Sequence, residues 1–483
     1  MASSALASPL RPLLASVAAA VLGVGLLAGC TPSDGTAAGP TSSAAAEVAT
    51  EVALPDSPLG EQARWILASL NEAPDASALS TEIGERFTPE FLDQVSADEL
   101  ATIFGQLAAE APYTPTAVQD AGETAVITIT AASGESLDVQ LAVDADGLVA
   151  GLLFAPSAAD RTPATSWSEL ETAVEGFAAD TTLVVTEVTG GAAGDRVAEA
   201  GSASASASSP SGSMFKLYVL GAVADAVAAG TLTWDTPLTL TDDVKSLPSG
   251  ELQDVPSGTT ITVQDAAQKM IEISDNTATD LLIAAVGAPA VAEQLTVMGH
   301  HDPAENTPFL TTRALFQLGW GDGGDGGAAR EAWRAAEEQD GAEGVAARQA
   351  VIDALPTGLL DIPVTAVTTP AWQDGLDWFT TPDDLVAAHL ALQQKAATPA
   401  GAPIRDILST NPGLGEFGDD WSYVAFKGGS SIGVLAGSWY LERADGRMFV
   451  VTIQGSSDDP AALTDQATFF GQVQDAVALL EKE

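Results

Sequence analysis

A serine followed three residues later by a lysine, at the start of a predicted helix, sets the strongest limit on this fold. Pro210-Ser-Gly212 disfavours a helix, so Ser213 is expected at the helix N-terminus, where free amides and the helix dipole favour a developing negative charge. One helical turn brings the Lys216 amine beside the Ser213 hydroxyl. A lysine that is buried near other cations can lose its proton and act as a base. Apolar residues follow at helical spacing up to a stop at Gly230: Phe215, Tyr218, Val219, Ala222 and Val223.

Two more polar segments carry chemistry. Ser274-Asp-Asn276 follows a predicted helix that begins at a capping box at Thr262, and the end of that helix would place Ser274 and Asn276 in a loop. A hydroxyl there can relay a proton, and a side-chain amide can hold a substrate carbonyl. Lys427-Gly-Gly-Ser430 precedes the strand-like stretches 435–441 and 447–453. Glycines on a strand let a substrate backbone approach closely, and Lys427 supplies a positive charge.

The order S-x-x-K, S-D-N, K-G-G over roughly residues 160–483 resembles the serine β-lactamase and penicillin-binding superfamily, and class A in particular. The resemblance implies an α+β fold of the α/β/α type, with an antiparallel sheet flanked by helices. It implies that Ser213 attacks an acyl carbonyl and that Lys216 accepts its proton. The resemblance also implies that Ser274 transfers a proton to the leaving group and that Lys427 attracts a substrate carboxylate. It assigns substrate binding to Asn276, Gly429 and Ser430, and an oxyanion hole to the amides of Ser213 and Ser430.

The chain departs from that family in two places. Gly428 stands where the family usually has a hydroxyl residue, and Ser430 or Ser431 are the alternatives that could compensate. Class A enzymes also carry an E-x-x-x-N pattern whose glutamate activates the deacylating water, and residues 300–313 lack that spacing. Glu305 is either its substitute or a solvated loop acid. The expected result is slow turnover of the acyl-enzyme for β-lactams, or a preference for esters.

Two functions therefore remain open. The first is a serine hydrolase of the β-lactamase/esterase type with a small acyl substrate, namely a β-lactam, an ester or a peptide. The second is a binding lipoprotein that captures β-lactams or cell-wall peptides without turnover, as a sensor or scavenger. Neither needs a cofactor. The histidines at 300, 301 and 389 lack metal-ligand spacing, so the sequence predicts no metal site.

The N-terminus indicates export. Residues 1–29 contain no acid and an apolar run from Leu13 to Leu27, which is typical of a signal peptide. Leu27-Ala-Gly-Cys30 resembles a bacterial lipobox, which implies acylation of Cys30 and an extracytoplasmic, membrane-anchored protein; the alternative is a plain secretory peptide with a chance cysteine. Cys30 is the only cysteine, so no intramolecular disulfide can form. The formal charge of −48 disfavours nucleic acids and anionic lipid headgroups as partners.

Composition divides the rest of the chain into a tether and two domains. Residues 30–56 are rich in Ala, Ser, Thr, Pro and Gly and read as a flexible tether. Residues 57–157 predict short helices followed by a meander of strands at 125–130, 137–143 and 148–154. Residues 158–483 form the hydrolase domain, with an insertion at about 321–355 that opens on GDGGDGG.

The domain at 57–157 also carries a resemblance of its own. It is similar to the N-terminal domain of the β-lactamase-like protein of clavulanic-acid gene clusters, which implies a ketosteroid-isomerase-like α+β shape. Residues 57–157 contain no histidine and no convincing acid–base pair. A structural or substrate-framing role is therefore favoured over a second active site.

Overall fold

The structure is a computed structural model that describes residues 52–483, apart from 93–94, 121, 135, 158–160, 340, 364–365 and 415–416. The predicted signal peptide, Cys30 and most of the predicted tether lie outside the described residues. Two compact units are present. The smaller unit runs to Thr162 and includes Thr464–Gly471, and the larger holds Pro163–Leu463 and Gln472–Glu483.

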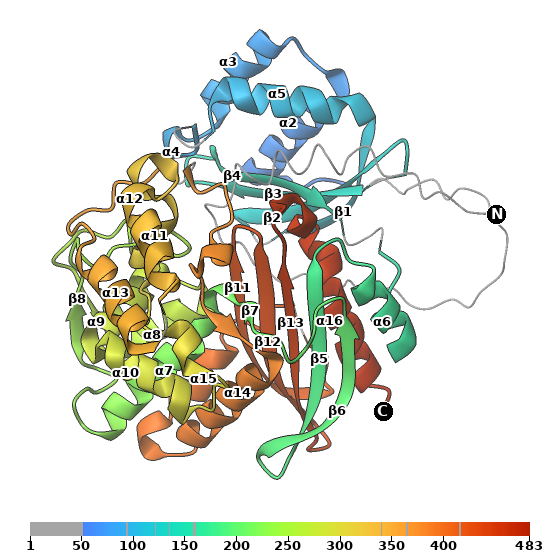
Figure 1. Ribbon diagram of the computed structural model, residues 1–483. Coiled ribbons are helices and arrows are strands. Elements are labelled where there is room, and N and C mark those ends of the chain that lie inside the picture. The colour runs from blue at the N-terminus through green and yellow to red at the C-terminus, as the bar shows by residue number, and fades with distance from the viewer. Residues whose placement is uncertain are drawn as a thin grey trace. The chain divides into compact units, whose positions relative to one another are not determined.

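The smaller unit combines helices with an antiparallel sheet (Figure 1). The three predicted strands are present, and a further strand, β1, precedes them. The sequence did not reveal β1, because Pro115 interrupts its alternation and the pairing shifts between Pro115 and Ala117. Apolar side chains from the helices and from one face of the sheet form its core. The elements are α2 Pro58–Glu72, α3 Ala76–Arg86, α4 Pro89–Leu92, α5 Ala97–Leu107, β1 Tyr113–Asp120, β2 Thr124–Ala131, β3 Ser136–Val143 and β4 Val149–Pro156.

The larger unit is built on a five-stranded antiparallel sheet of order β11-β12-β13-β5-β6. The predicted strands at 435–441 and 447–453 are β12 and β13, and β11 at the edge of the sheet carries Lys427. Two-residue strands, β7 and β10, pair separately beside the nucleophile segment. The strands are β5 Asp180–Thr189, β6 Ala192–Gly201, β7 Ser209–Pro210, β8 Pro237–Thr239, β9 Thr260–Thr262, β10 Phe379–Thr380, β11 Trp421–Ser431, β12 Val434–Arg443 and β13 Met448–Ser456.

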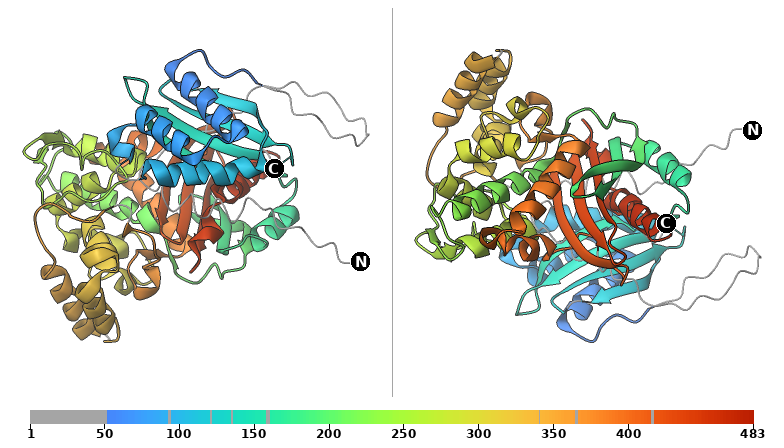
Figure 2. Two further views of the ribbon diagram at one scale, coloured as in Figure 1. Left: turned by 90° about the horizontal axis from the view of Figure 1, so that it is seen from above. Right: turned by 90° about the horizontal axis from the view of Figure 1, so that it is seen from below.

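Helices lie on both faces of this sheet, as predicted. Helix α14 packs on the face of the sheet where most helices of the larger unit lie, and α6 lies on the opposite face (Figures 1 and 2). The helices are α6 Trp167–Glu175, α7 Lys216–Ala228, α8 Val263–Glu272, α9 Asn276–Val286, α10 Ala288–Val297, α11 Thr312–Gly324, α12 Gly327–Glu337, α13 Gly341–Asp353, α14 Pro382–Ala396, α15 Ile404–Ser409 and α16 Gln466–Leu480. Among the described residues no single helix is long and apolar enough to span a bilayer; α9 and α10 reach that length and composition only together, with a bend of 92° between them.

Two local expectations need correction. Asn276 does not lie in the loop with Ser274 but begins α9, because the Asp275 side chain accepts a hydrogen bond from Ala278 N and caps the helix. The predicted helical stretch up to about residue 355 is present as α12 and α13, but the glycine-rich run at 321–327 does not lie wholly outside a helix, because α11 continues through Gly321 to Gly324.

Candidate active site

The predicted nucleophile lies in a short 3₁₀ turn, η3 (Gly212–Phe215), that leads directly into α7. Ser213 is partly exposed, whereas Lys216, the first residue of α7, is fully buried. Gly212 has φ +50°, in the left-handed region that glycine tolerates, and it turns the chain into η3. Ser213 therefore stands in the first turn of a helical segment, where backbone amides have no helical partner.

The Lys216 amine connects this turn to the S-D-N segment. Its Nζ donates to the Ser274 hydroxyl at 3.0 Å, to the Ser274 carbonyl and to Asn276 Oδ1 at 2.7 Å. In the part of the chain that the structure describes, the Ser213 hydroxyl has no hydrogen-bond partner. Lys216 therefore stands one turn from Ser213 along the chain, and its polar contacts are all with the second motif.

The lysine of the third motif converges on the same hydroxyl. Lys427 Nζ, on β11, lies 3.0 Å from Ser274 Oγ and donates to the Gly428 carbonyl at 2.7 Å. Its side chain is almost fully buried. Ser274 Oγ is thus flanked by two buried amines that come from segments more than 200 residues apart in the sequence. The structure brings together Lys216, Ser274, Asn276 and Lys427, as the motifs predict.

Burial changes the protonation of both lysines. It lowers the pKa of Lys216 well below its ordinary value, the charge of Lys427 lowers it further, and the carboxylates of Asp275 and Asp280 partly oppose this. Burial also lowers the pKa of Lys427, to about 7. Two ammonium groups on one hydroxyl repel each other, so the pair titrates in coupled steps. One amine of the pair can therefore be neutral near physiological pH and serve as a base.

Ser274 and its neighbours are held by hydrogen bonds with residues 249–252, which the sequence did not predict. Its backbone adopts φ +57°, which is uncommon for a residue with a side chain. Ser249 Oγ donates to the Ser274 carbonyl at 2.9 Å, and Asn276 N donates to the Ser249 carbonyl at 2.9 Å. Asp275 Oδ2 accepts from the amides of Glu251 and Leu252. Segment 249–252 has no motif of its own, so nothing in the sequence links it to Ser274.

Backbone from η3 and β11 meets closely at the predicted oxyanion hole. A Cβ built on Gly429 would lie 2.0 Å from the Ser211 carbonyl oxygen and 2.9 Å from Ser213 N. A Cβ built on Gly212 would lie 2.6 Å from Ser430 N. The two amides assigned to the oxyanion hole thus come to one junction, and only glycines allow so close an approach.

A buried carboxylate, Asp377, spans that junction. Its Oδ1 accepts from Gly212 N at 2.8 Å and from Ser211 N at 3.2 Å, and its Oδ2 accepts from the Ser431 hydroxyl at 2.7 Å. Burial raises the pKa of Asp377, and hydrogen bonds from Ser431 and from the amides of Gly212, Trp378 and Ser211 oppose the rise. Ser431, one of the two residues considered as compensation for Gly428, is therefore engaged with Asp377. No sequence signal marked Asp377, because it lies about 165 residues from the segment that it contacts.

Glu305, the candidate for water activation, lies in a different set of contacts. Its Oε2 accepts from the Ser208 hydroxyl at 2.6 Å and lies 3.9 Å from His301 Nε2. Among the described residues, none of its hydrogen bonds reaches Ser213, Lys216 or Ser274. This arrangement agrees better with a loop acid than with a base directed at the acyl group.

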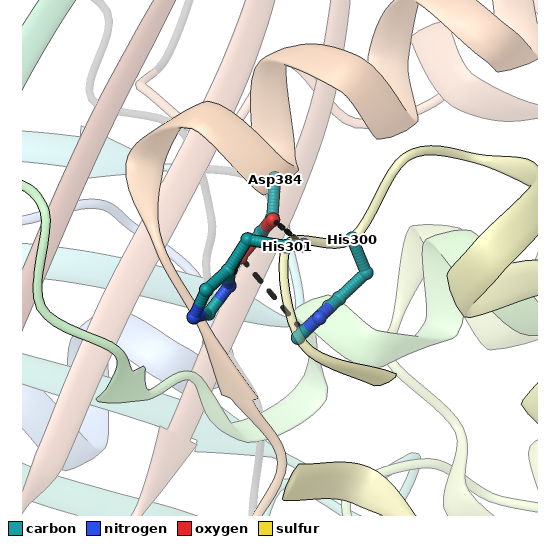
Figure 3. Close-up of side chains that lie close together, drawn as sticks. All are labelled: His300, His301 and Asp384. Atoms are coloured by element: carbon teal, nitrogen blue, oxygen red, sulfur yellow. Dashed lines mark hydrogen bonds and ion pairs between the residues drawn. The ribbon is translucent and has the colours of Figure 1, made fainter. Parts of the chain in front are cut away.

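His300, His301 and Asp384 lie close enough together to suggest a metal site (Figure 3). Their hydrogen bonds oppose that reading. His300 Nδ1 accepts from Asp302 N at 3.1 Å, and Nε2 lies 2.8 Å from the Phe379 carbonyl and 3.1 Å from Asn306 Nδ2. Both ring nitrogens of His300 are thus already in contact with polar groups of the chain. Asp384 already accepts from His301 N and Nδ1 and from Thr381, and it completes a capping box at the start of α14.

Sequence families match both units. The family described as "Beta-lactamase enzyme family" matches residues 166–477, and "ORF 12 gene product N-terminal" matches residues 54–149. The curated proteins contain no match to this chain.

Solved structures show similarity over about two thirds of the chain. A β-lactamase from Sphaerobacter thermophilus DSM 20745 is 21% identical, with a TM-score of 0.44, over 65% of this chain and 96% of that chain. A class A β-lactamase from Bacteroides cellulosilyticus DSM 14838 is 17% identical, with a TM-score of 0.45, over 67% and 100% of the two chains. The protein PBP-A is 18% identical, with a TM-score of 0.40, over 65% and 95%.

Proposed function

The chain belongs to the β-lactamase enzyme family, and we propose that it is a serine hydrolase that acts on β-lactams or related amides and esters through an acyl-Ser213 intermediate. The observation that carries this proposal is the pair of buried lysines, Lys216 and Lys427, on the hydroxyl of Ser274. A buried pair of this kind keeps a neutral amine available as a base, which an ordinary surface lysine does not.

The proposed acylation begins with the proton of the Ser213 hydroxyl. The neutral Lys216 amine accepts the Ser213 proton while Oγ forms its bond to the substrate carbonyl carbon. The resulting oxyanion is stabilised by the amides of Ser213 and Ser430. As the carbonyl re-forms, the bond to the leaving nitrogen or oxygen breaks. Ser274 gives its proton to that leaving atom and recovers one from the Lys216 ammonium at 3.0 Å, so protons and charges balance.

The other residues bind and orient the substrate. Lys427 in its cationic form attracts a substrate carboxylate, and Gly429 lets the substrate backbone approach β11. Asn276 Nδ2 donates one proton to the Leu247 carbonyl at 3.0 Å, so its second proton is available for a substrate carbonyl.

Deacylation is the step that decides between turnover and capture. Release of the acyl group needs a base for water, and residues 300–313 lack the E-x-x-x-N spacing that supplies this base in class A enzymes. Glu305 is engaged with Ser208. These observations favour slow release from β-lactam adducts. They also support a second candidate function, in which the protein captures β-lactams or cell-wall peptides as a sensor or scavenger.

Intact-mass measurements over time test both candidates. The wild type and Ser213→Ala are incubated with a penicillin, a cephalosporin and a simple ester. A transient adduct on the wild type that is missing from Ser213→Ala supports the hydrolase, and a permanent one supports capture. If no probe labels the wild type, both readings are wrong.

The remaining proposals concern location and the smaller unit. Signal-peptide cleavage before Cys30 and acylation of its thiol would hold the protein outside the cytoplasm at the cell membrane. For the smaller unit we propose a structural or substrate-framing role, which is supported by the lack of histidine in residues 57–157.

A further inference from the structure

Asp377 collects hydrogen bonds from two sides of the predicted oxyanion hole. On one side are Ser211 and Gly212, the two residues before the nucleophile; on the other is Ser431, the residue after Ser430 on β11. Its side chain is 3% exposed. A single buried carboxylate thus joins the segments that supply the two oxyanion amides, and hydrogen bonds to an ionised acceptor are stronger than those to a neutral one.

The residue after Asp377 strengthens the same connection. The Trp378 carbonyl accepts from Ser211 N at 2.8 Å and from Ser211 Oγ at 2.7 Å. The Trp378 ring stacks on Phe215, with the ring centroids 3.6 Å apart. The backbone on both sides of Ser213 is therefore in contact with residues 377–378.

Residues 374–379 are themselves anchored at both ends. Asp374 accepts from Arg330 Nε and Arg334 Nε on α12, each at 2.7 Å. At the other end, Asn306 and Phe379 exchange two hydrogen bonds of 2.8 Å. Asp377 is thus presented to the nucleophile turn by a segment with little freedom to shift.

From these contacts we propose that Asp377 is a positioning residue for acylation: it fixes the separation of the Ser213 and Ser430 amides by tying Ser211–Gly212 to Ser431. This inference rests on the proposed function, because it assigns Asp377 a role in the formation of acyl-Ser213. Asp377 itself does not touch the reacting atoms. Its effect is therefore expected in the rate of acylation and not in the initial binding of substrate.

The test compares Asp377→Asn, Asp377→Ala, Ser431→Ala and the double variant Asp377→Ala/Ser431→Ala in the full chain. Stopped-flow measurement with a chromogenic cephalosporin gives the acylation rate constant and the apparent binding constant, and intact mass confirms the site of labelling. Ser422→Ala is the matched control, because it makes the same change on β11 and its hydroxyl donates to the Glu442 carbonyl, on the neighbouring strand. Thermal unfolding of every variant identifies losses that are due to folding.

Misplacement of an oxyanion donor by a fraction of an ångström should lower the acylation rate constant about 10²-fold in Asp377→Ala, with a binding constant close to that of the wild type. Ser431→Ala should lower it about threefold to tenfold. In the double variant, Ser431→Ala should cause no further fall in the acylation rate constant beyond that of Asp377→Ala, because the two groups act through one hydrogen bond. Asp377→Asn retains an oxygen that can accept from the two amides, so its acylation rate constant should lie between those of the wild type and Asp377→Ala.

Wild-type acylation rates in both Asp377→Asn and Ser431→Ala would overturn the inference while leaving the proposed function intact. So would an effect confined to the binding constant or to the unfolding temperature. If Asp377→Ala does not fold, Asp377→Asn and Ser431→Ala still decide the question. A wild type that no probe acylates would overturn the proposed function, and this inference with it.

Discussion

At the scale of single residues, the site depends on a hydroxyl that two buried amines share. The sequence predicted Ser213, Lys216, Ser274 and Lys427 because each stands in a short motif whose order along the chain is itself informative. Asp377 could not be predicted in that way. Its contacts join positions that are distant in sequence, and an aspartate before a tryptophan has no chemical signature of its own.

The coupled lysines predict a bell-shaped dependence of acylation on pH. The acid limb arises because Lys216 must be neutral, and burial and Lys427 lower its pKa. The basic limb arises because Lys427 is cationic only below its pKa of about 7, so substrate binding weakens as the pH rises through that value. The acylation rate constant over pH measures the acid limb, and the ratio of that rate constant to the apparent binding constant measures both limbs. Lys427→Arg should move the basic limb upward, since a guanidinium stays protonated; an unmoved limb would contradict the assignment.

The contact at Gly429 predicts intolerance of even one methyl group. Gly429→Ala would place a carbon 2.0 Å from the Ser211 carbonyl oxygen, so β11 and η3 must separate. We expect the acylation rate constant to fall about 10²-fold or more. Gly418→Ala is the control, because a Cβ at Gly418 meets nothing within 4 Å. Equal rates in the two variants would show that the junction is not part of the site.

At the scale of elements, periodicity predicted the helices and strands with regular patterns. Thr262 caps α8 through the Asp265 amide, and Gly230 follows the end of α7, as the sequence predicted. Strand β1 could not be predicted, because Pro115 hides its alternation. The extension of α11 into Gly321–Gly324 could not be predicted either, because glycine has low helix propensity.

The contact between α12 and Asp374 predicts an effect on stability. Asp374→Ala removes the partner of two arginines, and Arg330 is 7% exposed. Leaving that guanidinium without its carboxylate should cost about 3 kcal/mol. For a unit of this size, that corresponds to a fall in Tm of ~5 °C. Thermal unfolding provides the measurement, and Asp325→Ala is the exposed-acid control on the adjacent turn. A Tm within 1 °C of the wild type would contradict the anchoring role of Asp374.

At the scale of the whole molecule, the family of the larger unit could be predicted from the sequence, since the order of its motifs is itself informative. The function of the smaller unit could not, because its described core is apolar and its strands carry no recognisable motif. The charge of −48 adds a constraint on location. A polyanion does not adsorb to an anionic bilayer by electrostatics, so any membrane attachment must come from another source.

Acylated Cys30 would be that source, with about 0.8 kcal/mol of membrane affinity for each buried methylene. We expect the wild type to remain with the membrane fraction after a high-salt wash and its N-terminal peptide to carry acyl mass. Cys30→Ala should be recovered in the soluble fraction, whereas Ser33→Ala, just beyond the lipobox, should behave like the wild type. A mature N-terminus without acyl mass would contradict the lipoprotein assignment.

The sharing of Ser274 by Lys216 and Lys427 also has a consequence for selectivity. Because two adjacent ammonium groups are costly in a buried site, the two lysines together hold no more than about one positive charge. A substrate with one negative charge neutralises that positive charge. A neutral substrate leaves the positive charge uncompensated, and a dianion brings one negative charge too many. We therefore expect the site around this hydroxyl to favour substrates that carry a single carboxylate.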